Sequence, residues 1–436
     1  MTATSPTASA SGVATEAGPI DRSALMGNYA APPVTFVRGD GSTLYDTVGR
    51  PYLDFLSGLA VTSLGHAHPA IADAIAVQAR TLSHVSNLFG NTLGPEVAAT
   101  LDRLIGGGVD RAGGQVFFAN SGAEANECAL KLARRWAGSG RFAVVSTWDA
   151  FHGRTLATLA ATGQPEKQAP FLPLPDGFDH VPYDDLAAMD AVCDPTRVAA
   201  VLVEPIMGEA GVVVPSSDYL VGLRQICTDR NILLMVDEVQ TGLGRTGRWF
   251  GFQHLGVEPD VVTMAKALGN GMPVGACWAR AEVAAAFVPG DHGSTFGGQP
   301  LAMAAVRATL AVMEAEDVPA RAQRLGAVLR RSLERLPGVV SVRGEGLLLA
   351  AVLANDFAVP ACREALEAGL VINAPRADVL RFAPSLLVSE ADIARATGTL
   401  GRILARLVAV FGSAGPGGPA DGPADGPPIG GADDAE

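Results

Sequence analysis

The sequence has few of the features that mark secreted, membrane-bound or metal-binding proteins. Its five cysteines are scattered and form no CxxC pair, which argues against a disulfide framework or a cysteine-bound zinc and fits a reducing cytoplasm. No apolar run approaches the roughly 18 residues that span a bilayer. The N-terminal residues have neither a basic leader nor an apolar core, so we expect no signal peptide. The seven histidines are too dispersed to predict a metal site.

Positive charge is also scarce. The formal net charge is −13, and a chain of this sign lacks the basic face that binding to a nucleic-acid backbone requires. Part of this charge lies beyond residue 411, in a Gly/Pro/Asp-rich tail without Lys or Arg. We therefore expect a cytoplasmic protein with no nucleic-acid and no membrane partner, whose folded body is less acidic than the whole chain.

Both ends of the chain have compositions that cannot form a core. Residues 1–23 are mostly Thr, Ala, Ser and Gly without periodicity, and residues 412–436 are Gly/Pro/Ala/Asp low complexity. Neither segment buries enough apolar area to order itself, so we expect a disordered N-terminal tail and a disordered acidic C-terminal tail. The remaining length is enough for a large domain with a smaller one attached.

Between these ends, apolar runs alternate with helical patterns. QVFFANSG leads into the helical AEANECALKLARRW, and FAVVST, VAAVLVEP, ILLMVDE, DVVTMAK and GACWAR follow. This alternation predicts an α/β fold, in which a mostly parallel sheet is covered by helices, over a large domain of residues 76–317. The pattern then changes to a smaller α+β domain over 318–411. Residues 24–75, rich in β-branched residues, are expected to pack beside that smaller domain.

Two charged residues follow buried runs in this pattern. ILLMVDE is five apolar residues ending on Asp237, and Lys266 ends DVVTMAK before a glycine-rich stretch. The carboxyl ends of parallel strands form the ligand-binding edge of such sheets, so both side chains are expected there. A partly desolvated lysine has a lowered pKa and can form a Schiff base with a carbonyl. Taken alone, Lys266 is better interpreted as an ordinary lysine at a strand end that reaches water, since lysines are almost always exposed.

A third feature narrows the chemistry. NSGAEA joins a strand to a helix, and there the N–H groups of Ser121, Gly122 and Ala123 can point at a phosphate, although by itself the motif also fits a capped turn. It is neither a Walker loop nor a GxGxxG fingerprint. A carbonyl-capturing lysine, a buried acid and a phosphate cup together match the needs of pyridoxal 5'-phosphate (PLP), whose protonated pyridine nitrogen the acid would maintain.

With these motifs in place, the sequence resembles the class III aminotransferases, PLP enzymes of fold type I. The resemblance runs from about Asn28 to Leu407 and is carried by LDFLSGLAVTSLGHAHP, FFANSGAEANECALKLAR, FHGRT, VEPIMGEAGV, VDEVQTGLGRTG, AKALGNGMPVGA, HGSTFGG and LRFAPSL. It implies that Lys266 holds the cofactor covalently and then moves a proton, and that Asp237 pairs with the pyridine nitrogen. Gln240 would bond the ring's phenolic oxygen, and Phe151 would stack on the ring.

The resemblance also implies a homodimer with active sites at the subunit interface. Ser121, Gly122 and Ala123 would cradle the phosphate, and Thr295 would reach it from the neighbouring subunit. His152 is interpreted as a residue behind the site, and Cys128 and Cys277 as small core residues.

For the substrate, the resemblance implies two carboxylate-binding arginines. Arg154 and Arg381 would each bind a carboxylate bidentately, with a surface salt bridge as the alternative for each. Glu209 would neutralise Arg381 when the amine donor has no carboxylate at that end. The remaining substrate-binding candidates are Ser294, Tyr29, for which simple packing is the alternative, and Leu59.

The choice of substrate within the family depends on fewer residues. Leu59 stands where members acting on ornithine typically have a tyrosine that holds the free α-amino group, and an aliphatic residue leaves room for an acyl cap. The expected reaction is transfer of the δ-amino group of N2-acetylornithine to 2-oxoglutarate, a step of arginine biosynthesis. Met207 and Gln299 replace the usual glutamine and asparagine, which keeps ornithine, succinylornithine and 4-aminobutyrate open as substrates. A PLP-binding protein without turnover is the remaining alternative.

Overall fold

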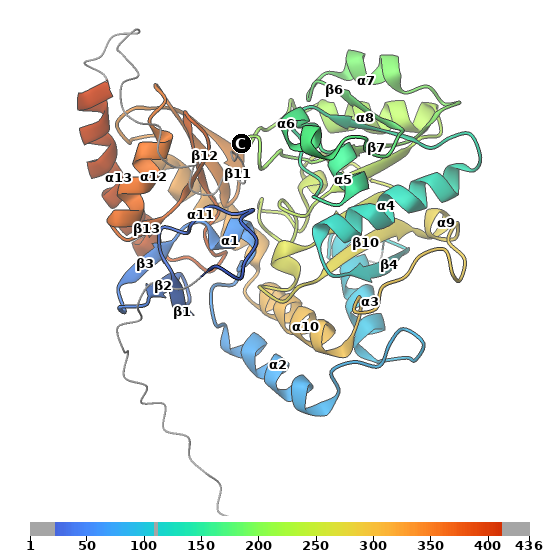
Figure 1. Ribbon diagram of the computed structural model, residues 1–436, viewed down its shortest axis with the longest axis horizontal. Coiled ribbons are helices and arrows are strands. Elements are labelled where there is room, and N and C mark those ends of the chain that lie inside the picture. Colours follow the sequence, from blue (N-terminus) through green and yellow to red (C-terminus); the bar gives the residue numbers. More distant parts are fainter. Residues whose placement is uncertain (1–21, 109–111, 412–436) are drawn as a thin grey trace, which may run out of the picture.

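The computed structural model describes residues 22–108 and 112–411. The expected disordered tails therefore lie outside the described residues, apart from residues 22 and 23. The described chain forms two lobes with helices on their outer surfaces (Figure 1). None of the helices in the described residues combines the length and the apolar character that a membrane span needs.

A seven-stranded sheet forms the centre of one lobe, in the order β4-β10-β9-β8-β7-β5-β6. The pairs among β9, β8, β7, β5 and β6 are parallel, and β10 runs antiparallel to both β4 and β9. The mostly parallel sheet expected from the sequence is thus confirmed. The strands are β4 (Gly114–Ala119), β5 (Ala143–Thr147), β6 (Phe178–Val181), β7 (Val198–Val203), β8 (Leu233–Asp237), β9 (Val261–Met264) and β10 (Gly275–Arg280).

This sheet is buried on both faces, which explains its uninterrupted apolar runs. In β8, Leu233 and Met235 pack into a cluster with helix α4 (Gly122–Ala137), whereas Leu234 and Val236 pack into a cluster with helix α8 (Tyr219–Asp229). Side chains alternate between the faces with a period of two residues, so every second apolar side chain meets a different helix layer. The polar residues that end these strands are thereby confined to the sheet edge.

Other helices complete this lobe. They are α2 (Pro69–Thr81), α3 (Leu93–Ile105), α5 (Leu156–Ala161), α6 (Pro165–Gln168), α7 (Leu186–Val192), α9 (Ala281–Ala284) and α10 (Pro300–Ala315), with short 3-10 segments η1 (Ala169–Phe171), η2 (Gly251–Leu255) and η3 (Lys266–Leu268). Helix α10 packs against both α2 and α3.

The second lobe contains two smaller sheets. One is antiparallel, in the order β11-β12-β15-β14, and the other joins β1, β2 and β3 to β13. Strand β13 pairs in parallel with β3, with Leu370 opposite Leu53, so residues far apart in the sequence share one sheet. The elements are β1 (Phe36–Asp40), β2 (Thr43–Asp46), β3 (Pro51–Asp54), α1 (Ser57–Ala60), α11 (Val318–Leu333), β11 (Val339–Glu345), β12 (Leu348–Leu353), α12 (Ala358–Glu367), β13 (Leu370–Val371), β14 (Asn373–Arg376), β15 (Val379–Phe382) and α13 (Glu390–Phe411).

A buried arginine connects the two lobes. Arg245 lies in the loop after β8, and its guanidinium donates to the carbonyl oxygens of Leu347 (3.1 Å) and Pro384 (2.6 Å) and to the hydroxyl of Ser63 (3.0 Å). Among the described residues no carboxylate pairs with it, and burial lowers its pKa to about 9. Backbone and hydroxyl oxygens alone therefore solvate this side chain.

Candidate active site

A cavity of about 410 Å³ opens at the carboxyl edge of the central sheet. Its lining includes residues at or shortly after the ends of four strands of this sheet: Ser121 after β4, Glu204 after β7, Asp237 at the end of β8 and Lys266 after β9. This edge is where open α/β sheets place their ligands. The residues predicted from the ends of separate apolar runs are thus brought to one cavity.

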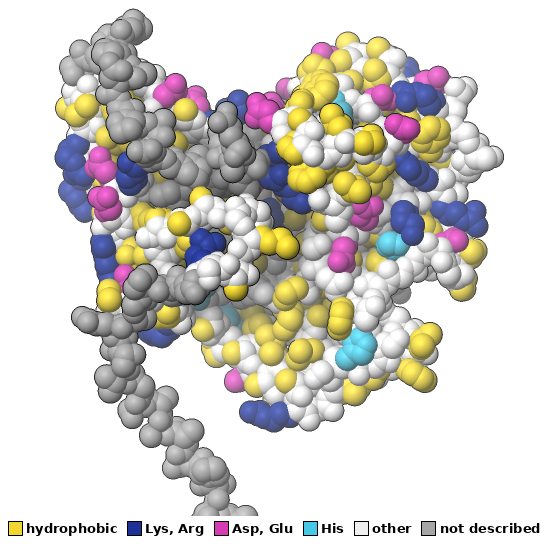
Figure 2. All heavy atoms as spheres, viewed as in Figure 1, with side chains coloured by type: hydrophobic (Ala, Val, Ile, Leu, Met, Phe, Trp, Pro, Cys, Tyr) yellow, Lys and Arg dark blue, Asp and Glu magenta, His cyan; other side chains and the backbone are white. Residues whose placement is uncertain are grey.

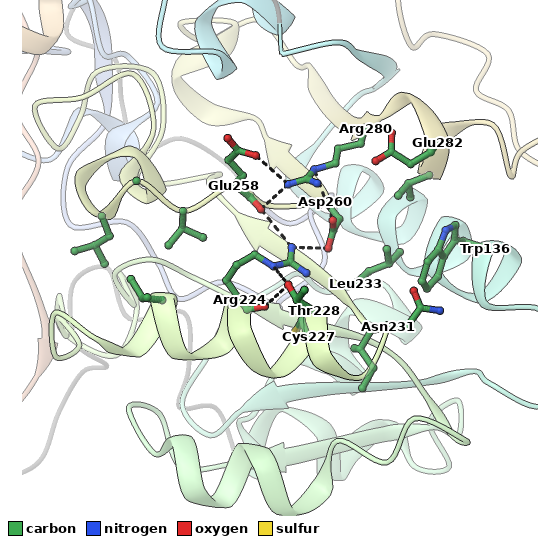
Figure 3. Close-up of a pocket in the computed structure, with 16 residues that line it drawn as sticks. Trp136, Arg224, Cys227, Thr228, Asn231, Leu233, Glu258, Asp260, Arg280 and Glu282 are labelled. Carbon is green, nitrogen blue, oxygen red and sulfur yellow. Dashed lines mark hydrogen bonds and ion pairs between the residues drawn. The ribbon is translucent and has the colours of Figure 1, made fainter.

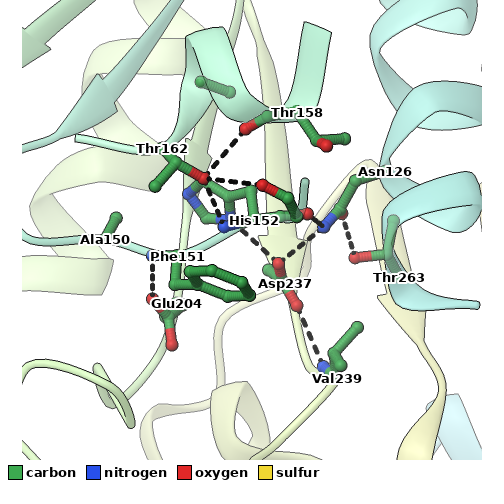
Figure 4. A network of polar contacts seen from close by, with 12 residues as sticks. Asn126, Ala150, Phe151, His152, Thr158, Thr162, Glu204, Asp237, Val239 and Thr263 are labelled. Carbon is green, nitrogen blue, oxygen red and sulfur yellow. Dashed lines mark hydrogen bonds and ion pairs between the residues drawn. The ribbon is translucent and has the colours of Figure 1, made fainter. Parts of the chain in front are cut away.

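Asp237 is held at the base of the cavity by three donors (Figure 4). Its Oδ2 accepts from Asn126 Nδ2 and His152 Nδ1, both at 2.8 Å, and its Oδ1 accepts from the backbone N–H of Val239 at 3.0 Å. The hydroxyl of Thr263 in turn donates to Asn126 Oδ1 at 2.7 Å. The carboxylate is therefore fixed in one orientation, with His152 behind it as the sequence predicted.

Lys266 begins the short helix η3 with φ at 37°, in the left-handed region that side chains other than glycine rarely occupy. Burial lowers the pKa of its amine, against the opposing effect of the Glu209 carboxylate. Within the described residues no carboxylate forms an ion pair with it. Lys266 lines the cavity, and its lowered pKa favours the neutral form of the amine, which is the nucleophilic form.

The amino end of α4 forms another part of the wall. Ser121 caps the helix, since its hydroxyl accepts from the N–H of Glu124 at 3.1 Å. The first N–H groups of a helix, here those of Gly122 and Ala123, have no acceptor within the helix, and the helix dipole adds positive potential. A Cβ on Gly122 would lie 3.0 Å from the side chain of Val239, which also lines the cavity. The segment suits close approach by an anion.

Positive charge surrounds Phe151 at the edge of the cavity. The guanidinium carbon of Arg154 lies 5.7 Å from the Phe151 ring centroid, and the Nζ of Lys167 lies 5.3 Å from it. Both distances are within the range of cation–π attraction. Phe151 and Arg154 line the cavity, so an anionic substrate meets a cationic environment there.

A buried ion pair lies next to this region. Arg381 Nη1 is 2.6 Å from Glu209 Oε1, and the two side chains are 1% and 19% exposed. Arg381 also donates to the carbonyl of Gly208 at 3.1 Å and, through Nε, to Asn373 Oδ1 at 3.1 Å. Burial alone would raise the pKa of Glu209, but the charges of Arg381 and then Lys266 lower it to about 2. Glu209 is therefore ionised at neutral pH.

Other predicted residues lie around or away from this cavity. Gln240 lines it, with Oε1 3.4 Å from Arg381 Nη1. Thr295 and Ser294 line an adjoining hollow of about 340 Å³, and Asn120, which borders both spaces, donates to Ser294 Oγ at 3.2 Å. Tyr29 is 70% exposed and outside the cavity.

Three further predicted positions also lie outside the lining. Leu59 is half-buried, whereas Val61 of the same segment does line the cavity. Met207 is buried against Ala150 and Ala210. Gln299 is buried, and its side-chain oxygen accepts from the N–H of Val85 at 2.9 Å. The effects of Leu59, Met207 and Gln299 on substrate choice stay predictions.

Sequence reasoning did not single out Glu204, Asn126 or Lys167. Glu204 follows the buried strand VAAVLV just as Asp237 follows its own strand, so the same signal was present. Asn126 is a polar residue on the buried face of an otherwise alanine-rich helix. Lys167 lies in a polar stretch with no comparable signal.

A second cavity, of about 580 Å³, lies at the opposite edge of the same sheet (Figure 3). Its charged groups neutralise one another: Arg224 is 2.7 Å from Asp260, and Arg280 is 3.6 Å from the same carboxylate. No lysine lines it. Of these two cavities, the one at the carboxyl edge is lined by Lys266.

Comparison with known proteins agrees with this geometry. The family Aminotransferase class-III matches residues 26–404, and the chain belongs to this family. It is a PLP-dependent aminotransferase. A structure of the ornithine aminotransferase from Toxoplasma gondii is described with partial occupancy of PLP at its active site.

Relatives and solved structures cover nearly the whole chain. The acetylornithine aminotransferase of Mycobacterium tuberculosis is 48% identical over 386 residues, covering 88% of this chain and 95% of that protein. That of Gloeobacter violaceus is 49% identical, covering 88% and 96%. The ornithine aminotransferase from Toxoplasma gondii ME49 has a TM-score of 0.83 at 36% identity, covering 89% and 94%. The acetylornithine aminotransferase from Elizabethkingia anophelis has a TM-score of 0.77 at 35% identity, covering 87% and 96%.

The residues present fit the cofactor that this family implies. PLP requires an amine for its aldehyde, an acid for its ring nitrogen and donors for its phosphate. The cavity lining contains one lysine, a fixed carboxylate at Asp237, and a helix amino terminus at Gly122, where a Cβ would crowd the side chain of Val239.

Proposed function

We propose that the protein transfers the δ-amino group of N2-acetyl-L-ornithine to 2-oxoglutarate, giving N-acetyl-L-glutamate 5-semialdehyde and L-glutamate in arginine biosynthesis. The observation that carries this proposal is the pairing of Arg381 with Glu209 beside a second arginine, Arg154. Such a site can accept a substrate with one carboxylate and a substrate with two. The names of relatives at 46–49% identity support the same substrate.

In this proposal, the residues around the cavity hold the cofactor. Lys266 would bind its aldehyde, Asp237 its ring nitrogen and Gln240 its phenolic oxygen, while Phe151 would pack on the ring. The phosphate would be bound by Ser121, Gly122 and Ala123. The bound cofactor supplies an electron sink, which stabilises negative charge developing on the substrate carbon.

Lys266 also has the acid–base role. Its lowered pKa favours the neutral amine, so Nζ could take a proton from the carbon that bears the substrate amine and deliver it to the carbon of the bound cofactor. Asp237 stays in place during these steps because Asn126, His152 and the N–H of Val239 fix it.

Two arginines bind the substrate carboxylates. Arg154 at the cavity edge would bind the α-carboxylate of acetylornithine, while Glu209 keeps Arg381 neutralised. With glutamate, a second carboxylate would replace Glu209 on Arg381, because a buried guanidinium left without a partner is strongly unfavourable. One cavity thereby serves both half-reactions.

A single-turnover half-reaction tests the substrate. Purified yellow enzyme is mixed separately with N2-acetylornithine, ornithine, succinylornithine or 4-aminobutyrate, and the loss of colour is followed. Fast bleaching by acetylornithine with slow bleaching by ornithine supports the proposal and the meaning of Leu59. The ornithine aminotransferase structures similar to this chain make ornithine the second candidate. If another amine reacts fastest, that amine becomes the proposed substrate. If no amine bleaches the enzyme, glutamate included, the result favours a PLP-binding protein without turnover.

We further propose a homodimer in which Thr295 completes the phosphate site of the partner subunit. Exposed apolar side chains support this, among them Leu88 (85% exposed), Phe89 and Phe296, and Figure 2 shows hydrophobic side chains gathered over the region of α2. Sedimentation should give twice the 44.7 kDa chain mass, and Leu88→Asp with Phe89→Asp should give monomers that lose PLP. A fully active monomer would contradict this.

The remaining expectations are proposals of the same kind. The division into residues 24–75, 76–317 and 318–411 is supported by the three separate sheets and by the β3–β13 pairing. A cytoplasmic location is supported by the five cysteines, all of which are buried and free.

A further inference from the structure

Glu204 is a buried carboxyl for which the proposed reaction has no role. It is 6% exposed, follows β7 and lines the cavity. Each of its oxygens accepts a backbone hydrogen bond. Oε1 accepts from the N–H of Phe151 at 3.0 Å, a contact visible in Figure 4, and Oε2 accepts from the N–H of Gly208 at 3.1 Å.

These two N–H groups belong to different loops, one next to Asp237 and one next to Arg381. The Phe151 loop also contains His152, which orients Asp237. Gly208 directly precedes Glu209, and its carbonyl accepts from Arg381 at 3.1 Å. One carboxylate therefore connects the loop next to the cofactor site with the segment that presents Glu209 to Arg381.

Neighbouring side chains hold the backbone of Glu204 and Gly208 in place. The Tyr183 hydroxyl is within hydrogen-bond distance of the carbonyls of Glu204 (2.9 Å) and Pro205 (3.1 Å), which fixes the backbone that bears the carboxylate. A Cβ on Gly208 would lie 2.1 Å from Gln240 Oε1, so this segment packs directly on the Gln240 side chain. A small displacement of Gly208 would consequently be transmitted to the Glu209–Arg381 pair.

We propose that Glu204 is a positioning residue for the choice between the two substrates: by holding the N–H groups of Phe151 and Gly208 together, it keeps Glu209 paired with Arg381 whenever the amine substrate is bound. The inference rests on the proposed alternation of substrates. The two oxygens of the Glu204 carboxyl group accept one N–H group each, whereas a carboxamide in the same place would have one acceptor oxygen and would direct an N–H group at the other donor.

Two measurements on Glu204→Gln test this. In the protein without cofactor, hydrogen exchange of peptides containing Phe151 and Gly208 should be at least tenfold faster than in the wild type. In the loaded enzyme, single-turnover rates should show the preference for glutamate over acetylornithine rising at least fivefold, because the loosened Glu209 competes less well for Arg381. Glu204→Asp, which keeps the charge on a shorter side chain, should shift the preference in the same direction and serves if the amide variant does not fold.

Glu238→Gln is the matched control. Glu238 is also buried, but it accepts from the N–H of Phe252 (2.9 Å) and from Thr241, away from both loops. Glu238→Gln should speed hydrogen exchange in the peptide containing Phe252 and leave the substrate preference unchanged. In the double variant Glu204→Gln/Glu209→Gln, the preference should equal that of Glu209→Gln alone, since both changes act through one contact.

Other outcomes overturn the inference. Unchanged exchange at both peptides, equal slowing of both half-reactions, or multiplicative effects in the double variant would each show that Glu204 does not act through Glu209. If the wild type reacts with glutamate but with none of the amines, the proposed function fails instead, and hydrogen exchange still decides whether Glu204 holds the two loops.

Discussion

Arg381 and Glu209 form an ion pair of 2.6 Å in which the arginine is almost fully buried and the carboxylate is not. Removing one member of such a pair leaves an uncompensated charge, at a cost of roughly 3–5 kcal/mol. The more exposed member is the one that a second carboxylate can replace at least expense. This asymmetry supports the proposed role of the pair in the choice between substrates.

Glu209→Gln should therefore raise the preference for glutamate. Without Glu209, Arg381 has no charged partner until a dicarboxylate arrives, so the single-turnover rate constant divided by the dissociation constant should rise for glutamate relative to acetylornithine by about tenfold or more. Stopped-flow bleaching with each substrate measures this. An unchanged ratio would mean that the pair does not take part in substrate choice.

Substitutions of Arg154 and of Arg381 should affect the binding of the two substrates differently. A hydrogen bond to a charged group contributes about 1.5–3 kcal/mol, so Arg154→Gln at the exposed edge of the cavity should weaken the binding of both acetylornithine and glutamate by about ten- to a hundredfold. Arg381→Gln should weaken glutamate far more than acetylornithine. Dissociation constants from single turnovers distinguish the two, with Arg224→Gln in the opposite cavity as a control that changes neither. Equal effects of both substitutions on both substrates would refute the assignment.

Lys266→Ala should abolish transamination. The change removes both the amine that binds the cofactor and the group that moves the proton, and loss of such a group costs several orders of magnitude in rate. The purified variant should lack the yellow absorbance that borohydride reduction bleaches in the wild type, and its circular dichroism should be unchanged. Normal turnover by this variant would show that another residue performs the chemistry.

The stability of the protein should depend on pH through the buried side chain of Glu238. Burial raises the pKa of Glu238 from 4.5 to about 7, so the folded protein binds this proton more tightly than the unfolded chain. Stability from this group is then fully present below about pH 4.5 and is lost as the pH rises towards 7, by up to about 3 kcal/mol. The unfolding midpoint of Glu238→Gln, relative to the wild type, should therefore increase between pH 5 and 8. A constant difference would mean that Glu238 titrates normally.

The sequence predicted the residues whose positions follow from strand ends. Asp237 and Lys266 terminate apolar runs, and because β8 and β9 are parallel, those ends meet at one edge of the sheet. The antiparallel direction of β10 was not foreseen, because its run GACWAR is as apolar as its parallel neighbours.

Residues whose positions depend on loop packing were harder to predict. Glu204 is held by the N–H groups of two separate loops, and Lys167 reaches the Phe151 ring from a short helix. Such contacts depend on tertiary arrangement and leave no periodic trace in the sequence. Leu59 is a related case: Val61 of the same segment lines the cavity and Leu59 does not, and the role of Leu59 in substrate choice stays a prediction.

Arg245 has a mechanical consequence for how substrates enter. If the two lobes moved apart as rigid bodies, the Arg245 guanidinium would lose its hydrogen bonds to Leu347, Pro384 and Ser63 at the same time. Motions that keep these hydrogen bonds of Arg245 cost less. We therefore expect the substrate to enter through local rearrangement around Phe151 and Glu209. Catalytic cycling would then proceed without a hinge.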